Sequence, residues 1–433
     1  MPLAELEAMV RRQPARREHW LNLGLGLNEA GRPDQALACF QQAAERDPGF
    51  AQAHYNCGVI LYHQGKIAEA VARYRTALEI QPNFVMARAN LGIALEAMDE
   101  SDAALAAYDE ASAIDPNAPG PYWNKALLLL RNGHYDQGWR YYEWRFSADS
   151  IGPGQIIPRR TFPGRRLWLG GETLKGKTIL LHEEQGLGDM IQFMRFVPMI
   201  AALGATIIIE TFTPLTRLFQ SLLATAGVQA VIGVGDKLPQ FDLYCPMMSL
   251  PCALGVTLET LPADCPYLSA PGETNLAWQK QLGAAKKPRV AFVWKSNSGP
   301  GAARSIPFKT FSALFSPEIE FISLQKSATD AEHALLDEHG INHIGHKLSD
   351  FADTAAVLEQ CDLVISIDTA LAHLAGALGK PVWILLPARA EWRWLKHTDT
   401  SPWYPSARLF RSKEQNTWSD IIQNMKAELA TRK

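Results

Sequence analysis

The chain has 433 residues, 47% of them hydrophobic, and a formal net charge of -3 at pH 7. This is more than one ordinary domain needs and is enough apolar material for two or three cores, so we expect a multidomain protein. The charge provides no basic field to neutralise nucleic-acid phosphates, which argues against DNA or RNA as a partner.

Compartment signals favour the cytoplasm. Residues Met1–Glu7 lack the basic region and apolar core of a signal peptide, and no apolar run is long enough to span a membrane. The six cysteines show no C-x-x-C spacing, which favours reduced thiols over disulfides or a zinc site. We therefore expect a cytoplasmic protein without a membrane span.

A pattern of small, aromatic and proline residues recurs every 34 residues in the first third of the chain. Its equivalent positions are Gly24, Ala36, Phe40 and Pro48, then Gly58, Ala70, Tyr74 and Pro82, then Gly92, Ala104, Tyr108 and Pro116. A fourth copy begins near Tyr122. The small residues would let two helices of one repeat approach closely, and each proline would end the second helix. The pattern resembles the tetratricopeptide repeat (TPR) from residue 17 to about 146.

We expect residues 1–146 to form an α-solenoid of about four such repeats. A stack of this kind presents a concave groove that suits an extended peptide or a protein partner. A rigid spacer or a dimerisation surface, which would make the protein an oligomer, explains the repeats equally well. Residues 147–176, rich in proline, glycine and arginine, are predicted to be an irregular connector.

The pattern changes from Lys177 onward. A strand at 178–182, a glycine-rich turn at 183–189 and a helix at 190–199 form the first unit of a Rossmann-like domain, although a full G-x-G-x-x-G is absent. Further strands are predicted at 206–210, 229–232 and 243–245, with a helix at 214–224.

A second set of elements starts at Arg289. Strands are predicted at 289–295, 320–324 and 381–386, helices at 309–315 and 353–360, and a last helix at 418–429 that would lie across the cleft. Two doubly wound halves place a ligand cleft between their carboxyl strand ends.

The segment Asp362–Gly376 runs from an apolar strand through a polar turn into a helix. Its turn, Asp368-Thr369-Ala370, lies where the new helix exposes unpaired backbone N–H groups that suit a phosphate. His373 returns to the same helix face one turn later. The alternative is that the turn only caps the helix and that His373 is a structural core residue.

Together these motifs resemble the bacterial heptosyltransferase-like glycosyltransferases of family 9, in the branch fused to TPRs. The matching segments are Glu184–Asp189 with Gln192-Phe193, Phe241–Leu243, Arg304–Pro307, Ser323–Lys326, Asp350–Thr354, Asp368–Gly376, Glu391–Trp394 and Trp403–Pro405. The resemblance implies a GT-B fold, with the acceptor bound by 177–285, the nucleotide-diphosphate-sugar donor bound by 286–433, and no obligatory metal or other cofactor.

The resemblance also implies roles for individual residues. Asp189 is the expected general base, taking the proton of the acceptor hydroxyl, and its alternative role is that of a helix cap. The turn before it contains Gln185, Gly186 and Gly188. Thr369, Ala370 and His373 would hold the donor diphosphate, whereas the anionic Asp368 would cap the turn or contact the sugar.

Other candidates contribute charge or ring surface. Lys295, Lys326 and Arg304 could offset the diphosphate charge, although the two lysines could equally be solvated strand ends. Trp392 and Trp394 are candidates for stacking on the base or acceptor, but such clusters more often seal a core. The segment 298–303 is short and uncharged, a departure from the family pattern that bears on donor choice and on activity itself.

The predicted function is inverting, metal-independent transfer of a hexosyl or heptosyl group to a protein or glycan acceptor recruited by the repeats. The alternative is a TPR scaffold with a degenerate, non-catalytic transferase region. An epimerase of similar architecture has no acid/base pair to support it beyond Asp189 and His373.

Overall fold

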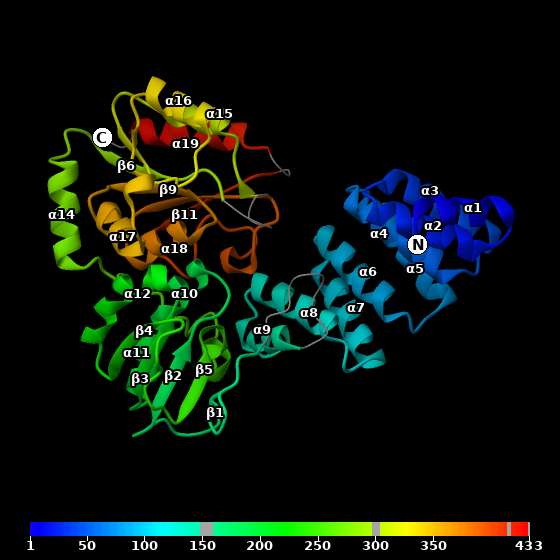
Figure 1. Ribbon diagram of the computed structural model, residues 1–433, viewed down its shortest axis with the longest axis horizontal. Helices are drawn as coiled ribbons and strands as arrows, with labels where there is room; N and C mark the ends of the chain where they lie inside the picture. The colour runs from blue at the N-terminus through cyan, green and yellow to red at the C-terminus, as the bar shows by residue number, and fades with distance from the viewer. Residues whose placement is uncertain (148–158, 297–303, 414–416, 432–433) are drawn as a thin grey trace. The chain divides into compact units, whose positions relative to one another are not determined.

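The computed structural model describes residues 1–147, 159–296, 304–413 and 417–431 (Figure 1). The chain divides into two compact units, Met1–Leu129 with Arg140–Pro158 and Leu130–Trp139 with Arg159–Lys433. Residues 130–139, which the sequence assigned to the fourth repeat, thus belong to the second unit. The segment 298–303 lies outside the described residues.

The first unit is built from helices. They are α1 (Leu3–Arg12), α2 (Arg17–Glu29), α3 (Pro33–Arg46), α4 (Ala51–His63), α5 (Ile67–Ile80), α6 (Val85–Ala97), α7 (Ser101–Ile114), α8 (Pro119–Arg131), α9 (Tyr135–Tyr142) and η1 (Glu143–Phe146). Helix α8 ends and helix α9 begins within residues 130–139, which belong to the second unit. No described helix combines the length and apolar character needed to cross a lipid bilayer.

Each repeat is closed by a glycine against an aromatic ring. A Cβ at Gly92 would lie 2.5 Å from the ring of Tyr108, and Gly24 and Gly58 stand in the same relation to Phe40 and Tyr74. Such distances leave no room for a side chain, so the two helices of a repeat meet at van der Waals contact. Helices α3, α5 and α7 each end two residues before the predicted proline.

The second unit contains a five-stranded parallel sheet in the order β1-β5-β2-β3-β4. Its strands are β1 (Arg166–Leu167), β2 (Thr178–His182), β3 (Thr206–Thr211), β4 (Val228–Gly233) and β5 (Leu243–Pro246). Its helices are α10 (Leu187–Phe193), η2 (Met194–Phe196), α11 (Val197–Ala202), α12 (Thr213–Phe219), η3 (Gln220–Ala224), η4 (Met247–Ser249) and α13 (Leu250–Ala253).

Two details differ from the expectation for this half. Helix α10 begins at Leu187 rather than Met190, because the Asp189 carboxylate accepts a hydrogen bond from the Gly186 amide and closes the first turn. The predicted connector is not wholly irregular, since its residues 166–167 pair with β5 as an edge strand.

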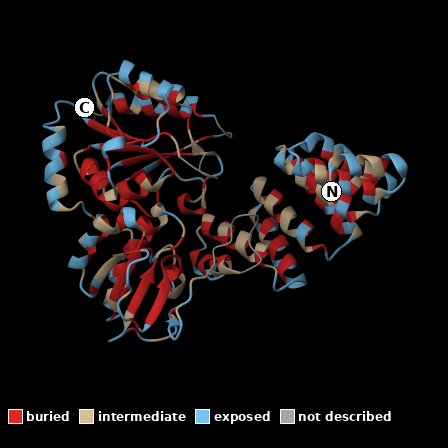
Figure 2. Ribbon diagram, in the orientation of Figure 1, coloured by how far each residue is buried: buried red, intermediate tan, exposed pale blue. Residues whose placement is uncertain are grey.

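A six-stranded parallel sheet follows, in the order β11-β10-β9-β6-β7-β8. Its strands are β6 (Arg289–Phe292), β7 (Glu320–Ser323), β8 (Asn342–His343), β9 (Leu363–Ile367), β10 (Val382–Leu386) and β11 (Ala407–Arg411). The helices are α14 (Gly272–Leu282), α15 (Phe308–Phe311), η6 (Ser312–Leu314), α16 (Asp330–Glu338), η7 (Gly345–Lys347), α17 (Phe351–Glu359), α18 (Ala370–Ala377), η8 (Trp392–Trp394) and α19 (Ser419–Thr431). The central strands are buried on both faces (Figure 2), as parallel sheets require.

The last helix does not lie across a cleft as expected. The apolar side chains of α19, among them Ile422 and Met425, join the core formed by β6, β7, β9 and β10. The helix therefore covers one face of its own sheet, the face also covered by α15 (Figure 1).

Strand order locates the ligand edge of each sheet. In the second sheet the order reverses between β6 and β9, and in the first between β2 and β5. Ligands of open parallel sheets bind beyond the carboxyl ends of the strands at such switch points. The turn at Asp368 follows β9 and the turn before Asp189 follows β2, so both predicted motifs lie at these edges.

Candidate functional site

The two motifs meet at the N-terminal ends of α10 and α18. A Cβ at Gly188 would lie 2.9 Å from Cδ2 of His373 and 3.2 Å from Cα of Ala370. Thr369 is the N-cap of α18 but makes no side-chain capping hydrogen bond, and its hydroxyl lies 3.1 Å from that of Ser366. The first turn of α18 therefore presents backbone N–H groups without a side-chain cap, which is the arrangement that suits an anion.

Asp189 is held from two sides. Its Oδ2 accepts a hydrogen bond of 2.8 Å from the Gly186 amide, and its Oδ1 accepts one from the Arg393 guanidinium of the other half. Burial raises the pKa of this carboxyl, while Arg393 and the amide oppose that rise. The helix-capping contact considered from sequence is thus present, alongside a charge partner that can keep the carboxylate ionised.

Arg393 is the functional candidate that sequence reasoning missed. Its guanidinium also donates to Gln192 Oε1 at 2.8 Å and to Glu391 Oε2 at 2.7 Å, and it lies 4.3 Å from the centre of the Trp392 ring. Arg393 stands 204 positions after Asp189. Only its place in the Glu391–Trp394 motif marked it, and no spacing rule links residues that far apart.

Arg304 is brought to the Asp368 turn as predicted, but it is already engaged there. It donates to the Asp368 backbone oxygen at 3.1 Å and to the Asp368 carboxylate at 2.8 Å, and it lies 3.0 Å from Glu391 Oε1. Burial and the nearby Glu391 raise the pKa of Asp368 to about 6, although Arg304 and Arg393 oppose the rise.

His373 is a buried residue held by its neighbours, as the structural alternative predicted. Its Nδ1 lies 2.9 Å from the Tyr404 hydroxyl, its Nε2 lies 4.0 Å from Asp368 Oδ1, and its ring stacks on Trp394 with 5.4 Å between centroids. Burial and three nearby arginines lower the pKa of this imidazole well below its usual value. His373 is therefore neutral at pH 7 and can offer a hydrogen bond but no positive charge.

The two predicted lysines are not gathered at the turn by any contact of the described residues. Lys295 is bound to Glu332 of α16, and although burial opposes it, this partner helps lower the pKa of Glu332 to about 2. Lys326 is exposed beyond the end of β7. Gln185 occupies the turn after β2 with a positive φ of 61°, so it shapes the backbone that leads into α10.

Trp392 and Trp394 are core residues, which was the alternative to a stacking role that the sequence left open. Both are buried, Trp392 against Trp139 and Trp403 and Trp394 against His373. Rings enclosed in this way have no free face for a nucleotide base, so stacking by these two tryptophans is not supported.

A second inter-half contact explains the Asp350–Thr354 motif. Asp350 caps α17 and receives two hydrogen bonds, 2.8 and 2.7 Å long, from Arg217 of α12. Arg217 also donates to Asp353 at 2.7 Å, and although burial opposes it, this contact helps lower the pKa of Asp353. Arg217 and the two aspartates therefore form an ion-pair network that joins α12 to α17, and they contribute no group to the Asp368 turn.

A charged cluster at the first sheet also escaped prediction. Arg160 donates to both oxygens of Glu210, which is buried at the end of β3, and lies 3.2 Å from Glu183 beyond β2. One guanidinium serves two carboxylates here. Burial and the charge of Glu210 raise the pKa of Glu183 to about 7, against the opposing effect of Arg160.

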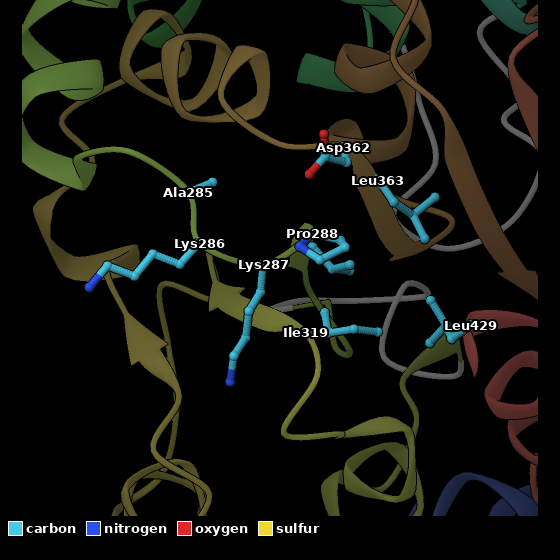
Figure 3. Close-up of a pocket in the computed structure, with 9 residues that line it drawn as sticks. Ala285, Lys286, Lys287, Pro288, Ile319, Asp362, Leu363 and Leu429 are labelled. Atoms are coloured by element: carbon cyan, nitrogen blue, oxygen red, sulfur yellow. The ribbon is translucent and has the colours of Figure 1, made fainter. Parts of the chain in front are cut away.

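A cavity of about 520 Å³ lies at the other edge of the second sheet (Figure 3). Its lining includes Lys286, Lys287, Asp362 and Leu429. Asp362 precedes β9, whereas Asp368 follows it, so the strand separates the cavity from the turn. The Asp362 carboxylate accepts a hydrogen bond of 2.8 Å from the Arg289 amide and so has a structural role. Among the described residues, no group of three or more histidine, cysteine, aspartate or glutamate side chains is arranged to hold a metal ion.

Three family profiles match parts of the chain. Tetratricopeptide repeat profiles match residues 21–83 and 61–127, and the glycosyltransferase family 9 (heptosyltransferase) profile matches residues 331–426. The predicted TPRs and the predicted resemblance to family 9 are confirmed. The family 9 match includes Asp368, His373 and Arg393 but not Asp189, which lies before it.

Individual proteins are similar to parts of the chain. Protein FlbA of Caulobacter vibrioides is 28% identical over 326 residues, which are 69% of this chain and 53% of the relative. The chain therefore spans about half the length of that curated relative. Among solved structures, MamA from Desulfovibrio magneticus RS-1 is 19% identical, covering 34% of this chain and 86% of its own, with a TM-score of 0.32. PilF of Pseudomonas aeruginosa is 22% identical, covering 34% of this chain and 67% of its own, with a TM-score of 0.31.

Proposed function

We propose that this chain, which joins TPRs to a region of glycosyltransferase family 9, is a glycosyltransferase of the GT-B type. It would transfer a sugar from a nucleotide-diphosphate donor to an acceptor hydroxyl with inversion at the anomeric carbon. The main observation in support is that the N-terminal ends of α10 and α18 meet. At this point the Asp189 carboxylate and the N-terminus of α18, which has no side-chain cap, lie at the switch points of two parallel sheets.

In this mechanism Asp189 takes the proton of the acceptor hydroxyl as its oxygen attacks the anomeric carbon. The bond from that carbon to the diphosphate oxygen breaks, and the nucleoside diphosphate leaves with the electron pair. The first N–H groups of α18 and the Arg304 guanidinium offset the charge that develops on the leaving group, and the neutral His373 can donate a hydrogen bond to it. These protein groups supply the charge compensation, so the proposal needs no metal.

The repeats have the proposed role of recruiting a protein or glycan acceptor in the cytoplasm. TPR stacks offer an extended concave surface, which would bring an acceptor to the transferase region at high local concentration. The proposal names a nucleotide-diphosphate sugar as the donor class and leaves the sugar and the base to the experiment.

Substitution of Asp189 by asparagine tests the base assignment. Because the amide cannot accept the proton, sugar transfer should fall by about 10²–10⁴-fold while donor affinity stays within a few fold. Asp420→Asn is the matched control, since Asp420 is an exposed carboxylate in the first turn of α19. Full transfer by Asp189→Asn with a verified acceptor would show that Asp189 is not the base.

A scaffold with a degenerate transferase region is the second candidate. The observation in its favour is that Asp189 and Arg304 are both engaged by internal partners. Calorimetry separates the two proposals. A scaffold binds a nucleotide-diphosphate sugar without hydrolysing or transferring it across a panel of donors and acceptors, whereas the enzyme releases nucleoside diphosphate.

A further inference from the structure

Two guanidiniums converge on one carboxylate beside the α18 turn. Glu391 Oε1 lies 3.0 Å from Arg304, and Glu391 Oε2 lies 2.7 Å from Arg393. Each arginine continues to a second carboxylate, Arg304 to Asp368 and Arg393 to Asp189. Through these two arginines, Glu391 links Asp368, in the turn after β9, to Asp189, in the helix that follows β2.

The three carboxylates differ in how easily another anion can replace them at the arginines. The side chain of Glu391 is 41% exposed, against 19% for Asp189 and 4% for Asp368. Asp189 is also fixed by the Gly186 amide. Contacts made by an exposed carboxylate are weak because water competes for them, whereas a buried charge that loses its partner is costly. Glu391 is therefore the one that can be exchanged for another anion.

Charge counting indicates that an exchange is needed. The ion-paired cluster itself holds two cations, Arg304 and Arg393, against three carboxylates, and the neutral His373 adds no positive charge. Outside the cluster, Arg195 acts on His373 and Glu184 acts on Asp189, one charge of each sign, so the carboxylates stay in excess. A diphosphate brings at least two further negative charges to the adjacent N-terminus of α18. Two guanidiniums arranged around one oxyanion match the way arginines bind phosphate.

We propose that Glu391 occupies the phosphate position of the two arginines in the ligand-free chain and that the donor diphosphate displaces it. Glu391 is then a gate at the donor site. Its release frees Arg304 and Arg393 for the phosphates while Arg393 keeps its contact with Asp189, so donor binding and placement of the base are coupled. This inference rests on the proposed donor site and adds its regulation.

The test uses the full chain and inorganic pyrophosphate, which carries the charge of the donor without requiring knowledge of the base. Glu391→Gln removes the competing charge but keeps the side-chain shape, so it should tighten pyrophosphate binding about tenfold in calorimetry. Glu391→Asp keeps the charge on a side chain one methylene shorter and should lie between that variant and the natural chain. Glu338→Gln, at an exposed carboxylate on α16, is the matched control and should leave binding unchanged.

The possible results separate three claims: the exchange of Glu391, the donor site itself and the transferase activity. Equal affinity of the natural chain and Glu391→Gln, or weaker binding by the variant, would overturn the exchange and leave the donor site standing. Absence of pyrophosphate binding by folded protein of every variant would overturn both proposals. Tighter binding by Glu391→Gln without sugar transfer from any donor would support the gate and count against the transferase.

Discussion

Gly188 of α10 lies against His373 of α18, with 2.9 Å between the position of a Cβ at residue 188 and Cδ2 of the histidine. His373 cannot yield easily, because Tyr404 and Trp394 hold its ring. The contact brings together the N-terminal ends of the two helices that carry the candidate base and the candidate phosphate turn. Glycine at 188 is therefore a requirement of the site rather than of the backbone conformation.

Gly188→Ala should separate the two helix ends. Overpacking of this kind typically costs about 1–3 kcal/mol, and we expect a lower melting temperature together with at least a tenfold loss of sugar transfer. Gly171→Ala is the control, because a Cβ there meets nothing within 4 Å. Unchanged transfer by Gly188→Ala would mean that the observed proximity of α10 and α18 is not the active arrangement.

Trp139 packs against the elements that carry Asp189 and Arg393. Its ring contacts Phe193, four residues after Asp189, and Trp392, which precedes Arg393. Trp139→Ala should destabilise the second unit by roughly 3–5 kcal/mol. It should also reduce sugar transfer more than donor affinity, because the residues that position Asp189 and Arg393 lose their packing. Trp139→Phe should recover part of both losses. Denaturant unfolding and steady-state kinetics measure the two effects, and a stability loss without any kinetic effect would contradict the supporting role.

The repeats make a separate stability prediction. Gly92→Ala would place a Cβ 2.5 Å from the buried ring of Tyr108, so the first unit should lose about 1–3 kcal/mol in chemical unfolding. Gln52→Ala, at an exposed position of α4, is the control and should change the stability by at most about 0.5 kcal/mol. Equal stability of the two variants would refute tight glycine–aromatic contact in the repeats.

Glu183 predicts a pH dependence of stability. Its pKa is raised in the folded chain to about 7 from 4.5, so the folded state binds the proton more tightly than the unfolded state. The penalty for ionising Glu183 is absent below the unfolded pKa and grows as the pH rises from about 4.5 to about 7. Glu183→Gln should therefore raise stability by roughly 2 kcal/mol at pH 8 and change it little at pH 4. Thermal melts at the two pH values measure this, and an equal effect at both would contradict the assignment.

Much of the fold followed from local sequence signals. The apolar runs of β2, β3 and β10 and the 34-residue repeat were visible because period and composition are properties of a few consecutive residues. The two-residue β8 is too short to show any period. Helix α16 was missed although its capping box, Thr329-x-x-Glu332, was readable in the sequence.

The site was predictable only where a motif is contiguous. The turn at Asp368 could be identified because strand, turn and helix follow one another. The partners of its groups could not, since Arg304, Glu391 and Arg393 acquire their roles from carboxylates in other elements. Whether Trp392 stacks on a ligand or fills a core likewise depends on Trp139, more than 250 positions earlier in the chain.

Diffraction from crystals soaked with nucleoside diphosphates of different bases tests the central proposal most directly. We predict that the diphosphate lies at the start of α18, with a phosphate oxygen within hydrogen-bond distance of the Thr369 or Ala370 amide, a second near Arg304, and the Glu391 carboxylate displaced. A nucleotide bound elsewhere, such as in the cavity at Lys286 and Lys287, with the α18 turn empty, would contradict it.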